Sequence, residues 1–309
     1  MAPIPKYPGS VPQTFYSPEQ LPSSEDEAHA WQEANKSFWE STPMRYDWNQ
    51  KVTYEEGGKE FFDEIDRRFF GNVRPFMPWK RIPFDNLIPF SELKHKKVLE
   101  IGVGLGSHAN LLSAQAQSYT GIDLSAYAVK MTAARMKIFQ RVADIRQMDA
   151  EDMKFPDSTF DFVWSWGVIH HSSNTRRILQ EMHRVLKPGG RAVVMVYNRG
   201  WWNYYVCGGL INSVLRGGIF RYGSVAKSIQ AHTDGALARY YSARSWKSLA
   251  GAYFNVEYAT VLGAKTDVFP IPSGRVKDAL MRLVPDPVSR FLTNQCGMGG
   301  FLISQLAKH

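Results

Sequence analysis

The sequence predicts an α/β protein built around a doubly wound parallel sheet. Short apolar runs bounded by turn residues alternate with helical stretches between Lys97 and Asn198, which is typical of buried parallel strands joined by crossover helices. A glycine-rich turn follows the first run, and aromatic residues at helical spacing precede it. The predicted strands are 97–103, 118–124, 160–168 and 191–198, and the predicted helices are 107–117, 125–139 and 175–187.

The composition is that of a soluble globular protein. The chain has 309 residues, 44% of them hydrophobic, which is enough for one large domain with additions. It shows no signal-peptide pattern and no apolar run of the roughly 18 residues that a membrane span needs, so we expect a cytoplasmic protein. Cys207 and Cys296 are far apart and have no partners at metal-ligand spacing, so we expect neither disulfides nor a metal site.

The pattern of the chain changes twice. Residues 1–30 are rich in Pro, Ser and charge, and we expect a flexible or docking arm that adds nothing to the core. Residues 31–97 carry aromatic side chains at helical spacing and predict a helical N-terminal lid. Residues 98–309 hold the main domain. Within it we expect a helix at 242–253, strands at 254–262 and 299–307, and insertions at about 199–240 and 263–297.

Three glycines, Gly102, Gly104 and Gly106, stand between the first strand and a helix. Glycines let the backbone bend tightly and approach a ligand without a Cβ in the way. The spacing is G-x-G-x-G rather than the G-x-G-x-x-G of dinucleotide sites. Glu100 precedes the turn inside the strand, and its carboxylate suits a cationic ammonium group rather than a diphosphate. A purely structural turn is the alternative.

Later acidic residues favour a nucleoside site. Asp123 ends the second strand, where an acid can bind both hydroxyls of a ribose. Asp149 and Ala150 follow a third strand, within reach of an adenine edge. Taken singly, Asp123 could be a turn residue and Asp149 a helix cap. Together, at successive strand ends, they indicate that a nucleoside binds here.

These residues lie in four motifs that cover roughly residues 95–200. The motifs are "VLEIGVGLGSH", "GIDLS", "MDAEDMKFPDSTFDFVWS" and "EMHRVLKPGGRAVVMVY". With them the chain resembles the class I S-adenosylmethionine-dependent methyltransferases, closest to the group that includes the ubiquinone and menaquinone biosynthesis enzymes. The resemblance implies a seven-stranded Rossmann-like sheet of order 3-2-1-4-5-7-6 with an antiparallel last strand. It also implies S-adenosylmethionine as cofactor and S-adenosylhomocysteine as product.

The resemblance also implies roles for individual residues. The first strand and the turn would line the methionine portion, the ends of the second and third strands would hold the ribose and adenine, and the fourth strand would flank the sulfonium. These residues are Glu100, Gly102, Gly104 and Gly106 for methionine, Asp123 for ribose, Leu124 for the adenine face, Asp149 and Ala150 for its edge, and Ser165 and Trp166 for the sulfonium.

Candidate residues for the acceptor side flank the same strand ends. His170 and His171 follow the fourth strand, and either is a candidate general base, although a capping or packing role is the alternative. Aromatic residues before the sheet and after its fifth strand are expected to wall an apolar acceptor pocket, while most of them pack in the core. Tyr46 and Tyr197 are the pocket candidates because each sits at an element end. The aromatic residues before the sheet are Trp31, Phe38, Trp39, Tyr46 and Trp48.

The net charge of +8 is concentrated in the last third of the chain. Residues 199–309 hold 13 Lys and Arg against 5 Asp and Glu. This excess indicates either a soluble basic face or an anionic partner, such as an anionic substrate group, a nucleic acid or a lipid surface. The aromatic stretch 201–216 favours a lid over the site, with a membrane interface as alternative. The cations expected to meet an anion are Arg216, Arg221, Arg239, Arg244, Arg275, Lys277 and Arg282.

Three functions compete. The favoured one is methyl transfer to a small-molecule acceptor, apolar or aromatic, whose identity and methylated atom stay open. The second is RNA methylation, because residues 168–190 also resemble wobble-uridine tRNA methyltransferases, although no RNA-binding module or Asn/Asp-Pro-Pro-Tyr/Phe signature is present. The third is a catalytically silent cofactor-binding partner, against which the intact nucleoside set argues. The proline-rich arm could also reach a second subunit in a homo-oligomer.

Overall fold

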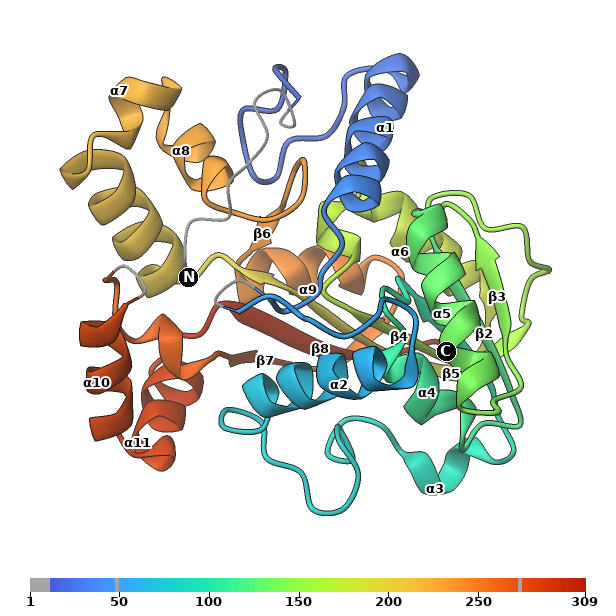
Figure 1. The fold of residues 1–309 in the computed structure, drawn as a ribbon. Helices are drawn as coiled ribbons and strands as arrows, with labels where there is room; N and C mark the ends of the chain where they lie inside the picture. Colours follow the sequence, from blue (N-terminus) through green and yellow to red (C-terminus); the bar gives the residue numbers. More distant parts are fainter. Residues whose placement is uncertain (1–11, 48–49, 272–273) are drawn as a thin grey trace.

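The computed structural model describes residues 12–47, 50–271 and 274–309, and these form an eight-stranded sheet with helices on both faces (Figure 1). The strand order is β3-β2-β1-β4-β5-β8-β7, and β6 pairs with β5. Strands β1 to β5 are parallel, whereas β8 is antiparallel to both neighbours. The strands are β1 (Lys97–Ile101), β2 (Ser118–Asp123), β3 (Asp144–Gln147), β4 (Phe160–Trp166), β5 (Leu186–Asn198), β6 (Tyr240–Tyr241), β7 (Asn255–Leu262) and β8 (Phe301–Ala307).

The predicted doubly wound α/β fold is confirmed, and the strand order differs by one element. The strands expected sixth and seventh are β7 and β8, and they follow β5 in the arrangement that the order 3-2-1-4-5-7-6 requires. The additional strand is β6, whose two tyrosines extend alongside Tyr197 and Asn198 of β5. Two residues are too few for an apolar period, so no sequence pattern predicted this strand.

The central strands have a hydrophobic core on each side because alternate residues point to opposite faces. Leu99 and Val163 belong to the core that α6 and α9 cover, whereas Val98 and Phe162 belong to the core under α2 and α4. Burial on both faces explains why these strands are continuous apolar runs in the sequence. The helices are α2 (Lys59–Val73), α4 (Ser107–Ser113), α6 (Thr175–Val185) and α9 (Ala243–Gly251).

Helix α1 (Glu25–Ser41) begins inside the segment expected to be an arm. The Ser24 hydroxyl caps it by accepting a hydrogen bond from the Glu27 N–H at 3.2 Å, and three acidic residues in the first turn suit the helix dipole. The expectation that residues 1–30 add nothing to the core is wrong, because Phe15 is buried against Trp31. The first turn is entirely polar, so an apolar period could not reveal it. Residues 1–11 and Trp48 lie outside the described residues.

Two helical segments occupy the ranges expected to be insertions, and both stand at the β7 side of the sheet, on the left of Figure 1. Within the described residues, no helix combines the length and apolarity that crossing a membrane requires. The first segment contains the π-helix η2 (Trp201–Leu215), α7 (Gly218–Tyr222) and α8 (Val225–Ala231). The second contains the 3-10 helix η3 (Lys265–Asp267), α10 (Arg275–Leu283), α11 (Asp286–Arg290) and the π-helix η4 (Phe291–Gln295).

A buried ion pair fixes α2 to α5 (Ala126–Ile138). The Arg135 guanidinium is fully buried, pairs with Asp66 of α2, and donates to the Leu105 carbonyl oxygen at 3.1 Å. Replacing Arg135 with Met should lower the free energy of unfolding by about 3–5 kcal/mol, because it leaves a largely buried carboxylate without its cation. Urea denaturation measures this loss. The exposed Arg141→Met is the matched control, and an equal loss in both variants would contradict the role of the pair.

Candidate active site

A cavity of about 820 Å³ opens at the carboxyl ends of the parallel strands. It brings together ten of the fourteen residues singled out from the sequence. Glu100, Gly106, Ser165 and His170 do not line the cavity wall, and their predicted contacts to ligands stay predictions. The ten lining residues are Gly102, Gly104, Asp123, Leu124, Asp149, Ala150 and Trp166 on the nucleoside side, and Tyr46, His171 and Tyr197 on the acceptor side.

The glycine turn needs its glycines for two different reasons. Gly102 has φ +82°, and a Cβ there would lie 2.1 Å from Val168 Cγ2, so tight packing excludes a side chain. Gly104 has φ +54°, and a Cβ there would meet open space. Gly104 lines the cavity, so its bare backbone is what a ligand would meet.

Asp123 at the end of β2 ties the turn to the next helix. Its Oδ2 accepts a hydrogen bond from the Gly104 N–H at 3.0 Å, and its Oδ1 accepts one from the Ser125 N–H at 2.9 Å. Burial raises the pKa of this carboxyl, and these backbone hydrogen bonds oppose the rise. The carboxylate is therefore held in place at the cavity wall before any ligand binds.

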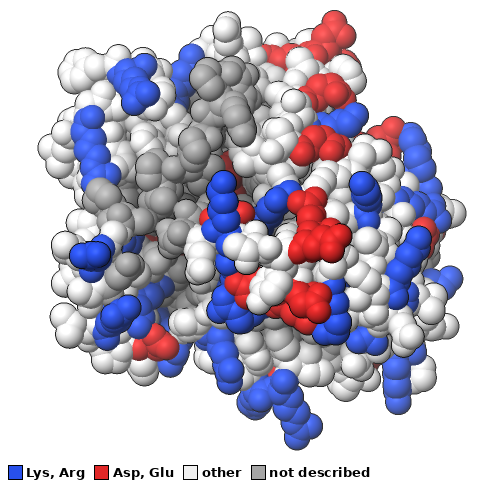
Figure 2. Space-filling view, viewed as in Figure 1, with Lys and Arg blue, Asp and Glu red and all other residues white. Residues whose placement is uncertain are grey.

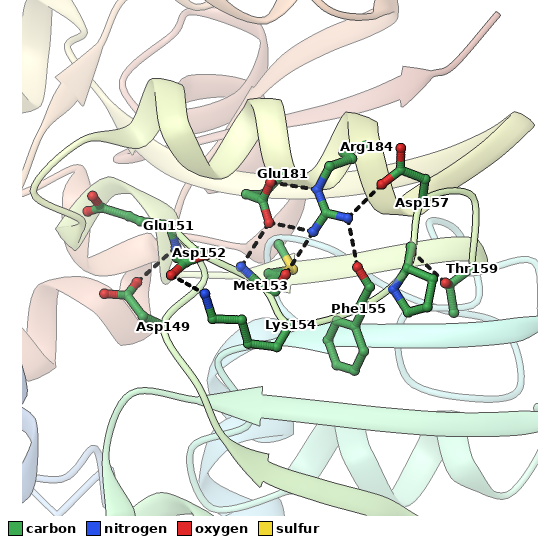
Figure 3. A network of polar contacts seen from close by, with 11 residues as sticks. Asp149, Glu151, Asp152, Met153, Lys154, Phe155, Asp157, Thr159, Glu181 and Arg184 are labelled. Carbon is green, nitrogen blue, oxygen red and sulfur yellow. Dashed lines mark hydrogen bonds and ion pairs between the residues drawn. The ribbon is translucent and has the colours of Figure 1, made fainter.

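Asp149 is held by a polar network between β3 and α6, which Figure 3 shows. The Asp149 Oδ1 accepts from the Glu151 N–H at 2.8 Å. Farther along, Arg184 of α6 donates to the carbonyl oxygens of Met153 and Phe155, both at 2.7 Å. These contacts anchor the segment after β3, so Asp149 and Ala150 are presented at the cavity by a fixed loop.

Glu100 lies behind the turn and not in the cavity. Its carboxylate accepts a hydrogen bond from the Tyr119 hydroxyl at 2.5 Å, and the His108 Nδ1 is 3.9 Å away. Burial raises the pKa of Glu100 to about 8, an effect that the Tyr119 hydrogen bond opposes. In this structure the carboxyl organises neighbouring strands, since Tyr119 belongs to β2.

Helix α1 supplies site residues that sequence reasoning missed. Gln32 donates to Asp149 Oδ1 at 2.9 Å, and Glu40 accepts from the Tyr127 N–H at 3.1 Å at the start of α5. Asn35 is buried in the cavity wall, where its side chain donates to the His171 carbonyl oxygen. Asn35 interrupts the buried stripe of α1 between Trp31 and Phe38, and a polar residue on such a stripe was the available signal.

His171 is held in one tautomer at the acceptor side. Its Nδ1 lies 2.9 Å from the Leu237 carbonyl oxygen, which can only accept, so Nδ1 carries a proton, and in the neutral ring the lone pair is on Nε2. The ring packs edge-on against Trp39, with centroids 5.1 Å apart. A Cβ on Gly235 would lie 2.4 Å from Nδ1, so the loop can approach this closely only because Gly235 has no side chain.

His170 and the two tyrosines have surroundings that differ from those of His171. His170 is fully buried, and among the described residues neither ring nitrogen has a hydrogen-bond partner. Burial lowers the pKa of His170 well below its usual value, so the ring is neutral. Tyr197 donates to Asp234 Oδ1 at 2.6 Å. Burial, assisted by the charge of Asp234, raises the pKa of both Tyr46 and Tyr197, so both phenols stay protonated.

Arg239 does not meet the expectation that it binds an anionic substrate group. It is buried, and it donates to the Ser172 carbonyl oxygen at 3.1 Å and to the carbonyl oxygens of Gln20 and Ser173. Its guanidinium lies over the Phe15 ring at 5.6 Å. Arg239 therefore fastens the N-terminal segment to the rim of the site, a structural role.

The strand order, with a cavity at the carboxyl ends of the strands, is that of the class I methyltransferase type. Residues 99–194 match the family described as a methyltransferase domain, and the chain contains a class I S-adenosylmethionine-dependent methyltransferase domain. This domain implies S-adenosylmethionine as the cofactor. The residues present fit this group, because Gly104 offers bare backbone to the cavity, Asp123 ends β2 at the cavity wall, and Asp149 follows the end of β3 at the same wall.

Similar proteins share this region of the chain. A phosphatidylethanolamine N-methyltransferase of Cereibacter sphaeroides is 37% identical over 103 residues, which is 32% of this chain and 49% of that protein. A demethylmenaquinone methyltransferase of Tropheryma whipplei is 32% identical over 103 residues, 33% of this chain and 42% of that protein. The match spans less than half of either relative. In fold, the chain resembles the methyltransferase solved in complex with the Haloferax volcanii Trm112 activator, with TM-score 0.52 and 16% identity over 84% of this chain and 100% of that one.

Proposed function

We propose that the protein transfers a methyl group from S-adenosylmethionine to a small lipid-like acceptor. The observation that carries this proposal is the cavity, which joins the glycine turn and Asp123 to an aromatic wall that includes Tyr46, Phe69 and Tyr197. One end matches the needs of an adenosyl group, and the other suits an apolar or aromatic molecule. The two relatives are named for phosphatidylethanolamine and demethylmenaquinone, and both of these acceptors are lipids.

The protein contributes positioning and water exclusion. When bound, S-adenosylmethionine supplies an electrophilic methyl group on a sulfonium. Holding the reacting partners at attack distance can contribute about 7 kcal/mol or more to lowering the barrier. Helix α1 closes over the cavity through Gln32, Asn35 and Trp39, and shields it from bulk water.

His171 is the residue that we assign to proton removal from the acceptor. Its Nε2 carries the lone pair because the Leu237 carbonyl oxygen holds the proton on Nδ1. Tyr197 is bonded to Asp234 and keeps its proton, so it orients the acceptor and does not act as a base. His171 Nε2 would take the proton of an acceptor hydroxyl as that oxygen accepts the methyl group, whereas a protonated amine would have to give up its proton to Nε2 beforehand, so that its nitrogen has a lone pair.

The cofactor site is tested by replacing Asp123. Asp123→Ala should weaken binding of S-adenosylhomocysteine about 10- to 150-fold, because hydrogen bonds to a charged group contribute about 1.5–3 kcal/mol. Isothermal titration calorimetry measures the affinity. Asp123→Asn, which keeps the side-chain volume, separates loss of charge from loosening of the turn. Asp144→Ala, an exposed acid at the start of β3, is the matched control, and wild-type affinity in both Asp123 variants would show that the site is elsewhere.

A further inference from the structure

Helix η2 carries an exposed apolar stripe. A second stripe, formed by Tyr204, Gly208 and Ser213, is buried, and Gly208 approaches Ile229 of α8 so closely that a Cβ would lie 2.8 Å from it. The exposed residues recur every four or five positions, which is one face of a π-helix, and one of them is a tryptophan that is 52% exposed. The stripe consists of Trp201, Tyr205, Leu210 and Val214.

Helix α10 has its apolar face turned outward. Val276 and Leu283 lie seven residues apart on one face and are 71% and 78% exposed. Lys277 on the neighbouring face is buried, with 3% exposed. An amphipathic helix that packs only against its own protein buries its apolar face instead. The orientation of α10 therefore indicates an apolar partner on the outside.

These exposed faces stand together on one side of the molecule. Trp201 donates through its indole N–H to the Cys296 carbonyl oxygen at 3.0 Å, and Trp202 donates to the Asp267 carbonyl oxygen at 2.8 Å, so η2 is joined to the segment that contains α10. Phe220 of α7, 91% exposed, belongs to the same group. Figure 1 shows η2, α7 and α10 at the same side of the sheet. We call the outer surfaces of these three helices the docking face.

The charge of this region is complementary to an anionic surface. Arg216, Arg221, Arg275 and Arg282 are exposed on or next to the three helices. Residues 199–309 hold only 5 acids against 13 basic residues, and one of these acids, Asp234, is buried. In Figure 2 the acidic side chains gather mainly over the other half of the molecule. Exposed aromatic and aliphatic residues surrounded by arginines are typical of proteins that rest on anionic lipid.

The acceptor cavity reaches this side of the molecule. Lys265, Thr266 and Asp267 of η3 belong to the cavity wall, and Asp267 is hydrogen-bonded to Trp202 of η2. We propose that the docking face binds the surface of an anionic phospholipid membrane, so that the acceptor passes from the bilayer into the cavity. The route of the acceptor rests on the function proposed above, whereas binding of the membrane does not.

Co-sedimentation of the full chain with lipid vesicles tests the docking face. We expect binding to vesicles of phosphatidylcholine with phosphatidylglycerol, and little binding to phosphatidylcholine alone. The double variant Arg275→Gln, Arg282→Gln should weaken the partition coefficient about fivefold for each arginine, and added salt should weaken wild-type binding. The double variant Val276→Ser, Leu283→Ser should weaken it about tenfold or more.

Val142→Ser is the matched control. Val142 is 93% exposed, but it lies between α5 and β3, at the opposite edge of the sheet, so this variant should bind as the wild type does. Failure of the wild type to sediment with anionic vesicles overturns the proposal. So does a dimer in light scattering that the Val276→Ser, Leu283→Ser variant abolishes, because a second copy would then cover the face.

Titration of S-adenosylhomocysteine into the same preparations separates the two proposals. If the protein binds S-adenosylhomocysteine but not the vesicles, only the proposal that the docking face binds a membrane is overturned. Vesicle binding without cofactor affinity would overturn the proposed function and leave the docking face supported.

Discussion

Replacing His171 with Ala is expected to lower methyl transfer by about 10²- to 10⁴-fold, because a positioned general base contributes a factor of that size. The hydrogen bond from Nδ1–H to the Leu237 carbonyl oxygen fixes the lone pair on Nε2, and no tautomer shift is needed before proton removal. Affinity for S-adenosylhomocysteine should stay close to that of the wild type. The measurement is transfer of a tritiated methyl group from S-adenosylmethionine into the lipid fraction of a cell extract.

Two controls separate a base from a packing residue. His170→Asn removes the imidazole without adding volume at a fully buried position outside the cavity wall, so its turnover should stay far closer to wild type than that of His171→Ala. Free imidazole should restore part of the turnover of His171→Ala, because it can take the proton in place of the missing side chain. Turnover at the wild-type rate in His171→Ala would exclude His171 as the base.

Replacing Gly102 with Ala is expected to lower the free energy of unfolding by about 2–5 kcal/mol. Its φ of +82° is unfavourable for any residue with a Cβ, and the new methyl group would lie 2.1 Å from Val168 Cγ2. The turn must shift to relieve the contact, so binding of S-adenosylhomocysteine should be lost as well. Urea denaturation and calorimetry measure the two effects.

Gly104→Ala is the informative comparison because its Cβ would meet open space. It should lower the free energy of unfolding by only about 1–2 kcal/mol, the cost of a positive φ for a residue with a Cβ. Its methyl group should still hinder binding of the cofactor. The double variant Gly102→Ala, Val168→Ala should regain part of the lost stability. Equal losses of stability in the two single glycine variants would mean that the contact with Val168 does not decide the role of Gly102.

The part of the fold that follows from local sequence patterns was predictable. Strands β1, β4 and β5 are buried on both faces, so they are apolar runs that the sequence displays directly. The start of α1 was not predictable in this way, because Glu25, Asp26 and Glu27 form a polar first turn. The short strand β6 depends on a tertiary contact with β5, and a local pattern does not contain that information.

The cofactor half of the site was more accessible to sequence reasoning than the acceptor half. Gly104, Asp123 and Asp149 follow strand ends, and the topology of a parallel sheet brings such positions together. The acceptor half depends on segments far apart in the chain: Asn35 contacts His171, and Leu237 sets the tautomer of the same histidine. The opposite burial of Lys277 and Val276 on α10 could not be predicted either, because an amphipathic pattern does not say which face is covered.

The side chain of Asn35 connects helix α1 to the orientation of His171. Its amide nitrogen donates to the His171 carbonyl oxygen, and its amide oxygen accepts from the Leu237 N–H at 3.3 Å. Leu237 is also the residue whose carbonyl oxygen orients the imidazole of His171. The Asn35 amide is therefore hydrogen-bonded to both backbone segments that hold His171 in place. If exchange of the spent cofactor requires α1 to move, that movement would break both Asn35 contacts and leave the imidazole without this support. In that case, closing α1 and orienting His171 would occur in the same step.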